Sequence, residues 1–302
     1  MNLRKVSSDL LNWQVTEAED QMILRDFLRN KIGISRGMVK ILKFDGGQIL
    51  VNQEQVTVRK ILTQGDQVKV IFPPEVRSPS LTPIEMPLEI VYEDDFILII
   101  NKPAKIAVIP SMSDQSPTIA NGLIHYYDQH KLNYTVHIVT RLDRDTSGLM
   151  LVAKQDYCHS LFHQKPIERH YQALVQGSLA VDEGTINAAI GRKPGSIIER
   201  MVREDGKHAI THYQVIKNFK HSSLVNIQLE TGRTHQIRVH FAHLGHPLIG
   251  DLLYGGPADQ VFDRQALHCT YLAFTHPITS EALQFESTWP DDQLTKFEQQ
   301  LS

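Results

Sequence analysis

Cysteine is scarce in this chain of 302 residues: Cys158 and Cys269 lie far apart, and no C-x-x-C pair occurs. This pattern argues against a disulfide-stabilised scaffold and a cysteine zinc site, and it favours a reducing compartment. Long apolar runs are also missing, since the longest, residues 96–100, is far too short to cross a bilayer. The N-terminus has no apolar core of the kind that signal peptides carry. We therefore expect a cytoplasmic protein without a membrane partner.

A strong positive charge is absent as well. The formal net charge is −3 at pH 7, whereas proteins that coat nucleic acid are usually basic. The basic side chains are unevenly distributed, because residues 25–43 contain six of them and one acidic residue, Asp26. A local basic patch on a near-neutral chain favours a selective RNA partner over indiscriminate binding.

Five prolines between positions 73 and 87 divide the chain. Proline at this density is typical of a semi-extended linker and excludes a core helix or strand. We predict an N-terminal domain at residues 1–76 with its core at 20–72, a linker at 77–87, and a larger domain at 88–302.

The N-terminal domain is predicted to begin with two helices. Residues 20–31 carry an apolar stripe, and Ser35 is a candidate N-cap for the second helix. In that helix Arg36, Lys40 and Lys43 recur at i, i+4 and i+7, so they form one basic stripe. A solvated basic face would produce the same pattern.

Short apolar runs at 49–51, 56–58 and 68–72 predict strands after these helices. Two helices with a basic face, followed by strands ending in G-D-x-V-x-V, resemble the alpha-L RNA-binding domain first known from a small-subunit ribosomal protein. The resemblance implies a small α/β domain in which the second helix and the turn before it contact RNA phosphates. The residues expected to bind RNA are Arg25, Ser35, Arg36, Lys40 and Lys43.

The richest group of candidate catalytic side chains lies within V-H-I-V-T-R-L-D-R-D-T-S-G-L-M-L-V-A-K, residues 136–154. Two apolar runs flank a polar, turn-forming segment, which predicts two strands joined by a functional loop. Asp143 and Asp145 alternate with Arg141 and Arg144, and neighbouring guanidinium groups favour an ionised carboxylate. Turn formers with surface ion pairs explain this spacing equally well, so the spacing alone leaves both interpretations open.

The segment R-L-D-R-D-T-S-G resembles the R-L-D-x-x-T-S-G loop of the RluA-type family of pseudouridine synthases. Two further segments, E-R-H-Y-Q-A-L-V-Q-G at 168–177 and T-G-R-T-H-Q-I-R-V-H at 231–240, resemble other motifs of that family. The resemblance implies that Asp143, rather than Asp145, is the essential catalytic carboxylate. Thr140 stands where the family usually has histidine, which puts in doubt any role for that histidine.

The resemblance implies roles for four more residues. Tyr171 would pack against the target base, although an ordinary core aromatic would fit the same strand. Arg238 would pair with the Asp143 carboxylate. Arg141 is expected to contact the substrate. Leu272 lies in L-H-C-T-Y-L-A-F-T-H-P at 267–277, which resembles the final motif of the family, and is expected to line the uracil pocket.

The resemblance also implies an α+β catalytic domain with a central mixed, mostly antiparallel sheet and flanking helices. The expected function is isomerisation of specific uridines in structured RNA, with large-subunit ribosomal RNA as the expected target and transfer RNA as the alternative. This reaction moves uracil from a bond through N1 to a bond through C5, so it needs a carboxylate and a sealed pocket but neither metal nor cofactor. We expect a monomer.

Two other functions are compatible with parts of the sequence. His235, His240, His243 and His246 are clustered, and Asp251 follows them, which would suit a metal-dependent phosphodiester hydrolase, although H-E-x-x-H is missing. A non-catalytic RNA-binding protein is the third possibility, against which the intact motifs argue.

Overall fold

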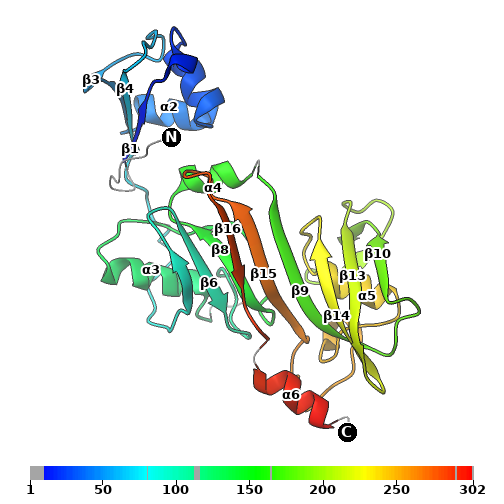
Figure 1. Ribbon diagram of the computed structural model, residues 1–302. Coiled ribbons are helices and arrows are strands. Elements are labelled where there is room, and N and C mark those ends of the chain that lie inside the picture. The colour runs from blue at the N-terminus through cyan, green and yellow to red at the C-terminus, as the bar shows by residue number, and fades with distance from the viewer. Residues whose placement is uncertain (1–9, 80, 112–115, 164, 290, 301–302) are drawn as a thin grey trace.

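The computed structural model of the protein describes residues 10–79, 81–111, 116–163, 165–289 and 291–300. A small N-terminal domain lies at one end of a larger domain (Figure 1). Residues 1–9 of the predicted N-terminal domain, Ser80 of the predicted linker, and residues 301–302 fall outside the described part. Among the described helices, none is long and apolar enough to span a membrane.

The N-terminal domain contains a four-stranded antiparallel sheet. Its strands, in spatial order, are β1 (Leu10–Gln14), β4 (Gln67–Ile71), β2 (Gln48–Val51) and β3 (Glu54–Gln55). Because β1 supplies buried Leu11 and Trp13, the predicted core at 20–72 was too short at its N-terminal end. The strand predicted at 56–58 was also wrong, because those residues leave the sheet and the Val58 carbonyl accepts a hydrogen bond from the Arg25 amide.

The two predicted N-terminal helices are present with altered geometry in the first. After a short η1 (Glu17–Glu19), the chain forms α1 (Leu24–Asp26), which continues as the π-helical turn η2 (Phe27–Lys31). The second helix, α2 (Arg36–Phe44), begins as predicted, since the Ser35 hydroxyl accepts a hydrogen bond from the Met38 amide at 3.1 Å.

The larger domain is built on a ten-stranded sheet. Eight strands form a continuous path in the order β10 (Glu183–Asn187), β13 (Ile210–Asn218), β14 (Ser222–Leu229), β9 (Ile167–Gln176), β15 (Leu267–Thr275), β8 (Ser147–Ala153), β6 (Ile97–Lys102) and β5 (Ile90–Glu93). Two more strands pair beside this path, β7 (His137–Ile138) with β8 and β16 (Ala282–Glu286) with β15. Among these described pairings, β15 with β8 is the single parallel one, which confirms the predicted mixed, mostly antiparallel α+β fold.

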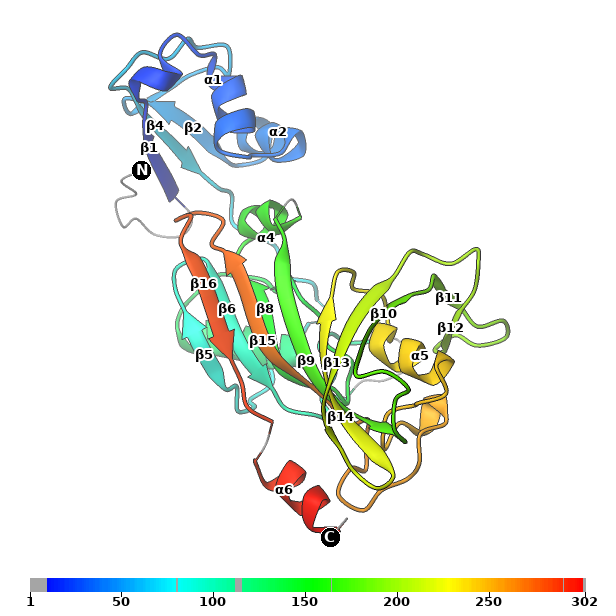
Figure 2. The same ribbon diagram turned by 45° about the vertical axis from the view of Figure 1, so that its right-hand side comes forward.

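Helices and a small ribbon flank this sheet. They are α3 (Ile119–Gln129), α4 (Asp156–Phe162), α5 (Gln236–His243), η3 (Leu252–Tyr254), α6 (Asp291–Gln300) and the strand pair β11 (Ile190–Arg192) and β12 (Arg200–Val202). Helix α5 lies beside β13 and β10, and α6 lies at the end of the molecule farthest from the N-terminal domain (Figures 1 and 2). Leu244, the residue directly after α5, is 40% exposed.

The centre of the sheet is held by a close approach of β8 to β15. All seven residues of β8 are buried. Gly148 has a φ of +112°, and a Cβ at this position would lie 2.3 Å from the Cys269 carbonyl oxygen. Glycine is therefore required in T-S-G. The contact places the loop that precedes β8 over the middle of the sheet.

The proline-rich segment runs along the larger domain and is attached to it. The Arg77 guanidinium donates hydrogen bonds to the carbonyls of Tyr134, at 2.7 Å, and Leu132, at 3.0 Å. The predicted linker thus has no regular structure but is held in place by the larger domain.

The core of the N-terminal domain continues into helix α4. The Tyr157 ring is buried and stacks on Phe72 with 4.9 Å between ring centroids, and its hydroxyl donates to the Ile32 carbonyl at 3.2 Å. The two domains therefore share a buried contact.

We expect Tyr157→Ala to lower the free energy of unfolding by about 3–5 kcal/mol, because a large ring leaves a packed site. Tyr157→Phe keeps the ring and removes one hydrogen bond, so its cost should be about 1 kcal/mol. Guanidinium denaturation of both variants measures the difference. Equal costs would mean that the ring contributes nothing to the domain contact.

Candidate active site

Asp143 lies in the loop between β7 and β8, and its side chain is 26% exposed. The loop turns back through a hydrogen bond from the Thr146 amide to the Asp143 carbonyl at 3.1 Å. Thr140, at the position where the resemblance would place histidine, is buried, and its hydroxyl accepts a hydrogen bond from the Leu151 amide at 2.8 Å. Thr140 thus anchors the start of the loop to β8.

Lys102 holds the other side of this loop. It is 1% exposed, and its ammonium group donates hydrogen bonds to the carbonyls of Pro103, Ile106 and Arg144 at 2.7 to 2.9 Å. Burial lowers the pKa of Lys102 to about 7, while the nearby Asp145 carboxylate opposes the shift. Asp145 is half-buried near Lys102 and is not among the described residues that line the cleft with Asp143.

Arg238 joins two carboxylates. Its Nη1 donates to Asp143 Oδ2 at 3.2 Å, while Nε and Nη2 donate to the two oxygens of Asp251 at 2.7 and 2.8 Å. Burial alone would lower the pKa of Arg238, but the bonds to Asp251 and the charges of both carboxylates raise it. The predicted contact between Arg238 and Asp143 is present, and Asp251, which is 1% exposed, holds the guanidinium in orientation.

A histidine and a tyrosine complete this cluster. The Tyr254 ring covers the Arg238 guanidinium, with 4.9 Å from Cζ to the ring centroid. His235 has a left-handed backbone, with a φ of +58°, at the start of α5. Its Nδ1 bonds the Tyr254 hydroxyl at 2.7 Å, and its Nε2 lies 3.9 Å from Asp143 Oδ2. Burial lowers the pKa of His235, so the ring is neutral at pH 7.

These residues lie in a cleft of about 520 Å³. Among the described residues that line it, Asp143 is the single carboxylate. The arginines that line the same cleft are Arg141, Arg169, Arg200, Arg233 and Arg238. One carboxylate surrounded by guanidinium groups suits a polyanionic substrate with one reaction centre, because arginine binds phosphate in a bidentate fashion.

Apolar side chains and Tyr171 form another part of the lining. Tyr171 is 5% exposed on β9, and burial raises its pKa well above the usual range, so the hydroxyl stays protonated. Leu272 does not line the cleft: it is fully buried farther along β15, opposite Arg169. Leu267, five residues earlier on the same strand, lines it instead. The prediction for Leu272 was wrong because it identified the correct strand but the wrong position on it.

A second groove lies on the other face of β9. Its volume is about 870 Å³, and its lining includes His170 and Gln172, which alternate with the cleft residues Arg169 and Tyr171. Alternate residues of a strand face opposite sides of the sheet, so this groove is separate from the cleft with Asp143.

The predicted histidine cluster does not converge on one point. His235 bonds Tyr254, His240 lies between the Thr211 hydroxyl and the Ala188 carbonyl, and His246 bonds the Gln176 carbonyl. These three imidazoles are thus engaged separately within the fold, and His243 is exposed.

The predicted RNA-binding residues lie far from this cleft in sequence and belong to the N-terminal domain. Arg36, Lys40 and Lys43 are exposed on α2. Arg25 is exposed and pairs with Asp26 at 3.2 Å, while the Ser35 hydroxyl caps α2.

Comparisons with known proteins agree with this geometry. Residues 96–243 match the family model described as RNA pseudouridylate synthase. The uncharacterised RNA pseudouridine synthase YjbO of Bacillus subtilis is 47% identical over 87% of this chain and 94% of its own length. The chain belongs to the RNA pseudouridylate synthase family.

Two other relatives agree with this assignment. Ribosomal large subunit pseudouridine synthase D of Vibrio cholerae is 38% identical over 82% of this chain and 81% of its own length. The solved structure of human RNA pseudouridylate synthase domain containing 1 superposes with a TM-score of 0.56 and 26% identity, over 72% of this chain and 87% of that chain. The enzyme class predicted from the motifs, an isomerase acting on uridine in RNA, is confirmed, and the hydrolase alternative finds no support.

Sequence reasoning missed two members of the synthase site. Asp251 was considered only as a metal ligand, although it stands in G-D-L-L-Y-G directly after the third motif. Lys102 was not predicted as a site residue. A buried lysine and a buried aspartate need partners, but the sequence does not name those partners.

We expect Asp251→Ala to lower the free energy of unfolding by about 3–5 kcal/mol, because it leaves the buried Arg238 guanidinium without its bidentate partner. Isomerase turnover should fall as well, since Arg238 is then no longer oriented toward Asp143. The matched control is Asp205→Ala, which breaks another two-point aspartate–arginine pair, with Arg203, at an exposed position, and should cost at most about 1 kcal/mol. Urea denaturation compares the two, and equal costs would contradict the structural role of Asp251.

Proposed function

We propose that this synthase isomerises specific uridines of large-subunit ribosomal RNA. The names of two relatives support this target: the proteins of Vibrio cholerae and Haemophilus ducreyi are both called ribosomal large subunit pseudouridine synthase D. Ribosomal RNA as target implies that the enzyme works in the cytoplasm. The observation that carries the reaction assignment is the single carboxylate, Asp143, in a cleft with five arginines.

The target uridine enters this cleft after leaving its stack, because the reacting atoms are inaccessible inside a helix. The arginines at the rim bind the flanking phosphates, which offsets the cost of unstacking. Tyr171 and Leu267 provide an apolar surface for the uracil ring. A cleft of about 520 Å³ lies within the usual size range for small-ligand pockets.

Asp143 carries the chemical step. The bond from C1′ to N1 breaks, the uracil turns within the cleft, and C5 forms the new bond to C1′. The proton on C5 departs and N1 gains one, so atoms and electrons balance without an oxidant or a water. A carboxylate adjacent to the sugar can support this exchange, as in retaining glycosidases. Arg238, oriented by Asp251, keeps the Asp143 oxygens directed into the cleft.

The N-terminal domain supplies a second contact with RNA. Its α2 helix presents Arg36, Lys40 and Lys43 to solvent in one row, which suits the phosphates of a neighbouring stem and agrees with the alpha-L resemblance. Every group of the proposed reaction centre comes from one chain, so we propose that the enzyme acts as a monomer.

The test of this proposal is pseudouridine mapping of total RNA from cells that lack the protein. We expect one or a few sites in large-subunit ribosomal RNA to disappear, and wild-type protein to restore them. Asp143→Asn should restore none because the amide cannot replace the reacting carboxylate. Asp145→Asn is the matched control, since Asp145 lies outside the cleft, and it should restore the sites. If Asp143→Asn restored the sites, another residue would have to carry out the reaction. If the lost sites lay in transfer RNA, transfer RNA would be the substrate instead of ribosomal RNA.

Replacing Arg36, Lys40 and Lys43 simultaneously by glutamine should weaken RNA binding. It should also reduce the slope of log affinity against log salt by about 2–3, because roughly one unit is lost for each phosphate that these side chains no longer bind. Filter binding between low and moderate salt measures the slope. The matched control removes three exposed basic residues of the larger domain, Lys193, Lys217 and Lys220. The same slope in wild type and in the α2 variant would mean that this row of side chains only faces solvent.

A further inference from the structure

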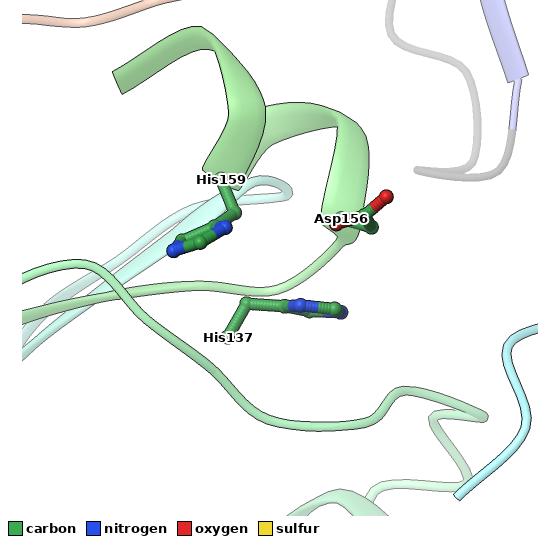
Figure 3. Close-up of side chains that lie close together, drawn as sticks. All are labelled: His137, Asp156 and His159. Atoms are coloured by element: carbon green, nitrogen blue, oxygen red, sulfur yellow. The ribbon is translucent and has the colours of Figure 1, made fainter. Parts of the chain in front are cut away.

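Three metal-ligating side chains meet outside the cleft, at the junction of β7 with α4. His137 comes from β7, and Asp156 and His159 lie at i and i+3 on α4, with ligand atoms within 4.8 Å of one another. In Figure 3 Asp156 and His159 come from the same short helix, and His137 lies across from them on a separate segment. The ring centroids are 5.9 Å apart.

Each of the two histidines has a hydrogen-bond partner on its ring. His137 Nε2 bonds the Glu75 carboxylate at 2.9 Å. The Ile138 backbone carbonyl accepts a hydrogen bond from the His159 ring. Metal-binding histidines characteristically donate their other N–H to a carboxylate or carbonyl, which fixes the tautomer and leaves a lone pair on the remaining nitrogen.

Glu75 is itself held in place as an acceptor. Its carboxylate accepts hydrogen bonds from the amides of Asp156, at 2.8 Å, and Thr135, at 3.3 Å. Glu75 therefore orients His137 through a carboxylate that two backbone amides hold in place, without being a ligand itself.

The Asp156 carboxylate is available to a cation. It is exposed, and no hydrogen bond or ion pair of that carboxylate occurs within the part of the chain that the structure describes. In a tetrahedral Zn²⁺ site, bond lengths of about 2.1 Å place the ligand atoms about 3.4 Å from one another, so the three groups must come closer together when the ion binds.

We propose that His137, His159 and Asp156 bind a divalent transition-metal ion of the Zn²⁺ class, with Glu75 as the outer partner of His137. Two imidazole nitrogens and one carboxylate favour Zn²⁺ over Mg²⁺ or Ca²⁺, which prefer oxygen ligands. Such an ion joins β7 to α4 beneath the segment that carries Glu75. Because α4 also carries Tyr157, which packs against Phe72, the bound ion stabilises the surface on which the N-terminal domain rests. It takes no part in the reaction in the cleft.

The experiment uses full-length protein freed of metal with a chelator. Zn²⁺ binding is measured by isothermal titration calorimetry, and Co²⁺ binding by visible absorption. We expect one ion per chain and a rise in melting temperature with Zn²⁺. His137→Gln, His159→Gln and Asp156→Asn should each weaken binding at least about 10-fold, and Glu75→Gln by about 10-fold, because outer partners tune affinity to that extent.

The matched control is His243→Gln, which removes an exposed histidine on α5 and should leave affinity and stoichiometry unchanged. The double variant His137→Gln/His159→Gln should show neither the Co²⁺ absorption nor the rise in melting temperature, with unchanged far-UV circular dichroism. Equal Zn²⁺ affinity in the wild type and this folded double variant would overturn the proposal. These readouts do not involve isomerase activity, so their outcome is independent of the proposed function.

Discussion

The active site depends on one guanidinium group held between two carboxylates. Asp251 binds Arg238 through two buried hydrogen bonds, and the third bond of Arg238 goes to Asp143 in the cleft. A buried charge of this kind is tolerated only when it is paired and hydrogen-bonded. The buried Asp251–Arg238 pair therefore fixes the position of the more exposed Asp143. Tyr254 covers the guanidinium and also bonds His235. Through Tyr254, the Asp251–Arg238 pair therefore also positions the start of α5.

The loop that carries Asp143 is held from both sides for a related reason. Thr140 attaches its beginning to β8, and Lys102 binds the Arg144 carbonyl from the buried side. The close contact of Gly148 with β15 then determines where β8 starts. The catalytic role proposed for Asp143 requires its carboxylate to be positioned to a fraction of an ångström, and a site supported by strands is more precise than one on a free loop. Here the loop acquires that precision from its neighbours.

The same architecture links the two domains without a long free tether. The proline-rich segment lies along the larger domain through Arg77 and Glu75, and Tyr157 enters the core of the N-terminal domain. The RNA contact proposed for α2 would thus be made at a defined position relative to the cleft. The proposed metal site lies at this junction, where β7, α4 and the proline-rich segment meet, and so it acts on domain arrangement rather than on chemistry.

Several features could be derived from sequence because the signals are local. The Ser35 cap and the loop motif with Asp143 each occupy a short continuous segment, and local geometry follows from local residue type. Other features were decided by tertiary structure alone. The choice of Leu267 over Leu272, the orienting role of Asp251 and the meeting of His137 with His159 depend on how distant strands and helices pack together. A side chain's partners across a sheet are set by register and by strand order, and neither quantity is encoded in any single stretch of the chain.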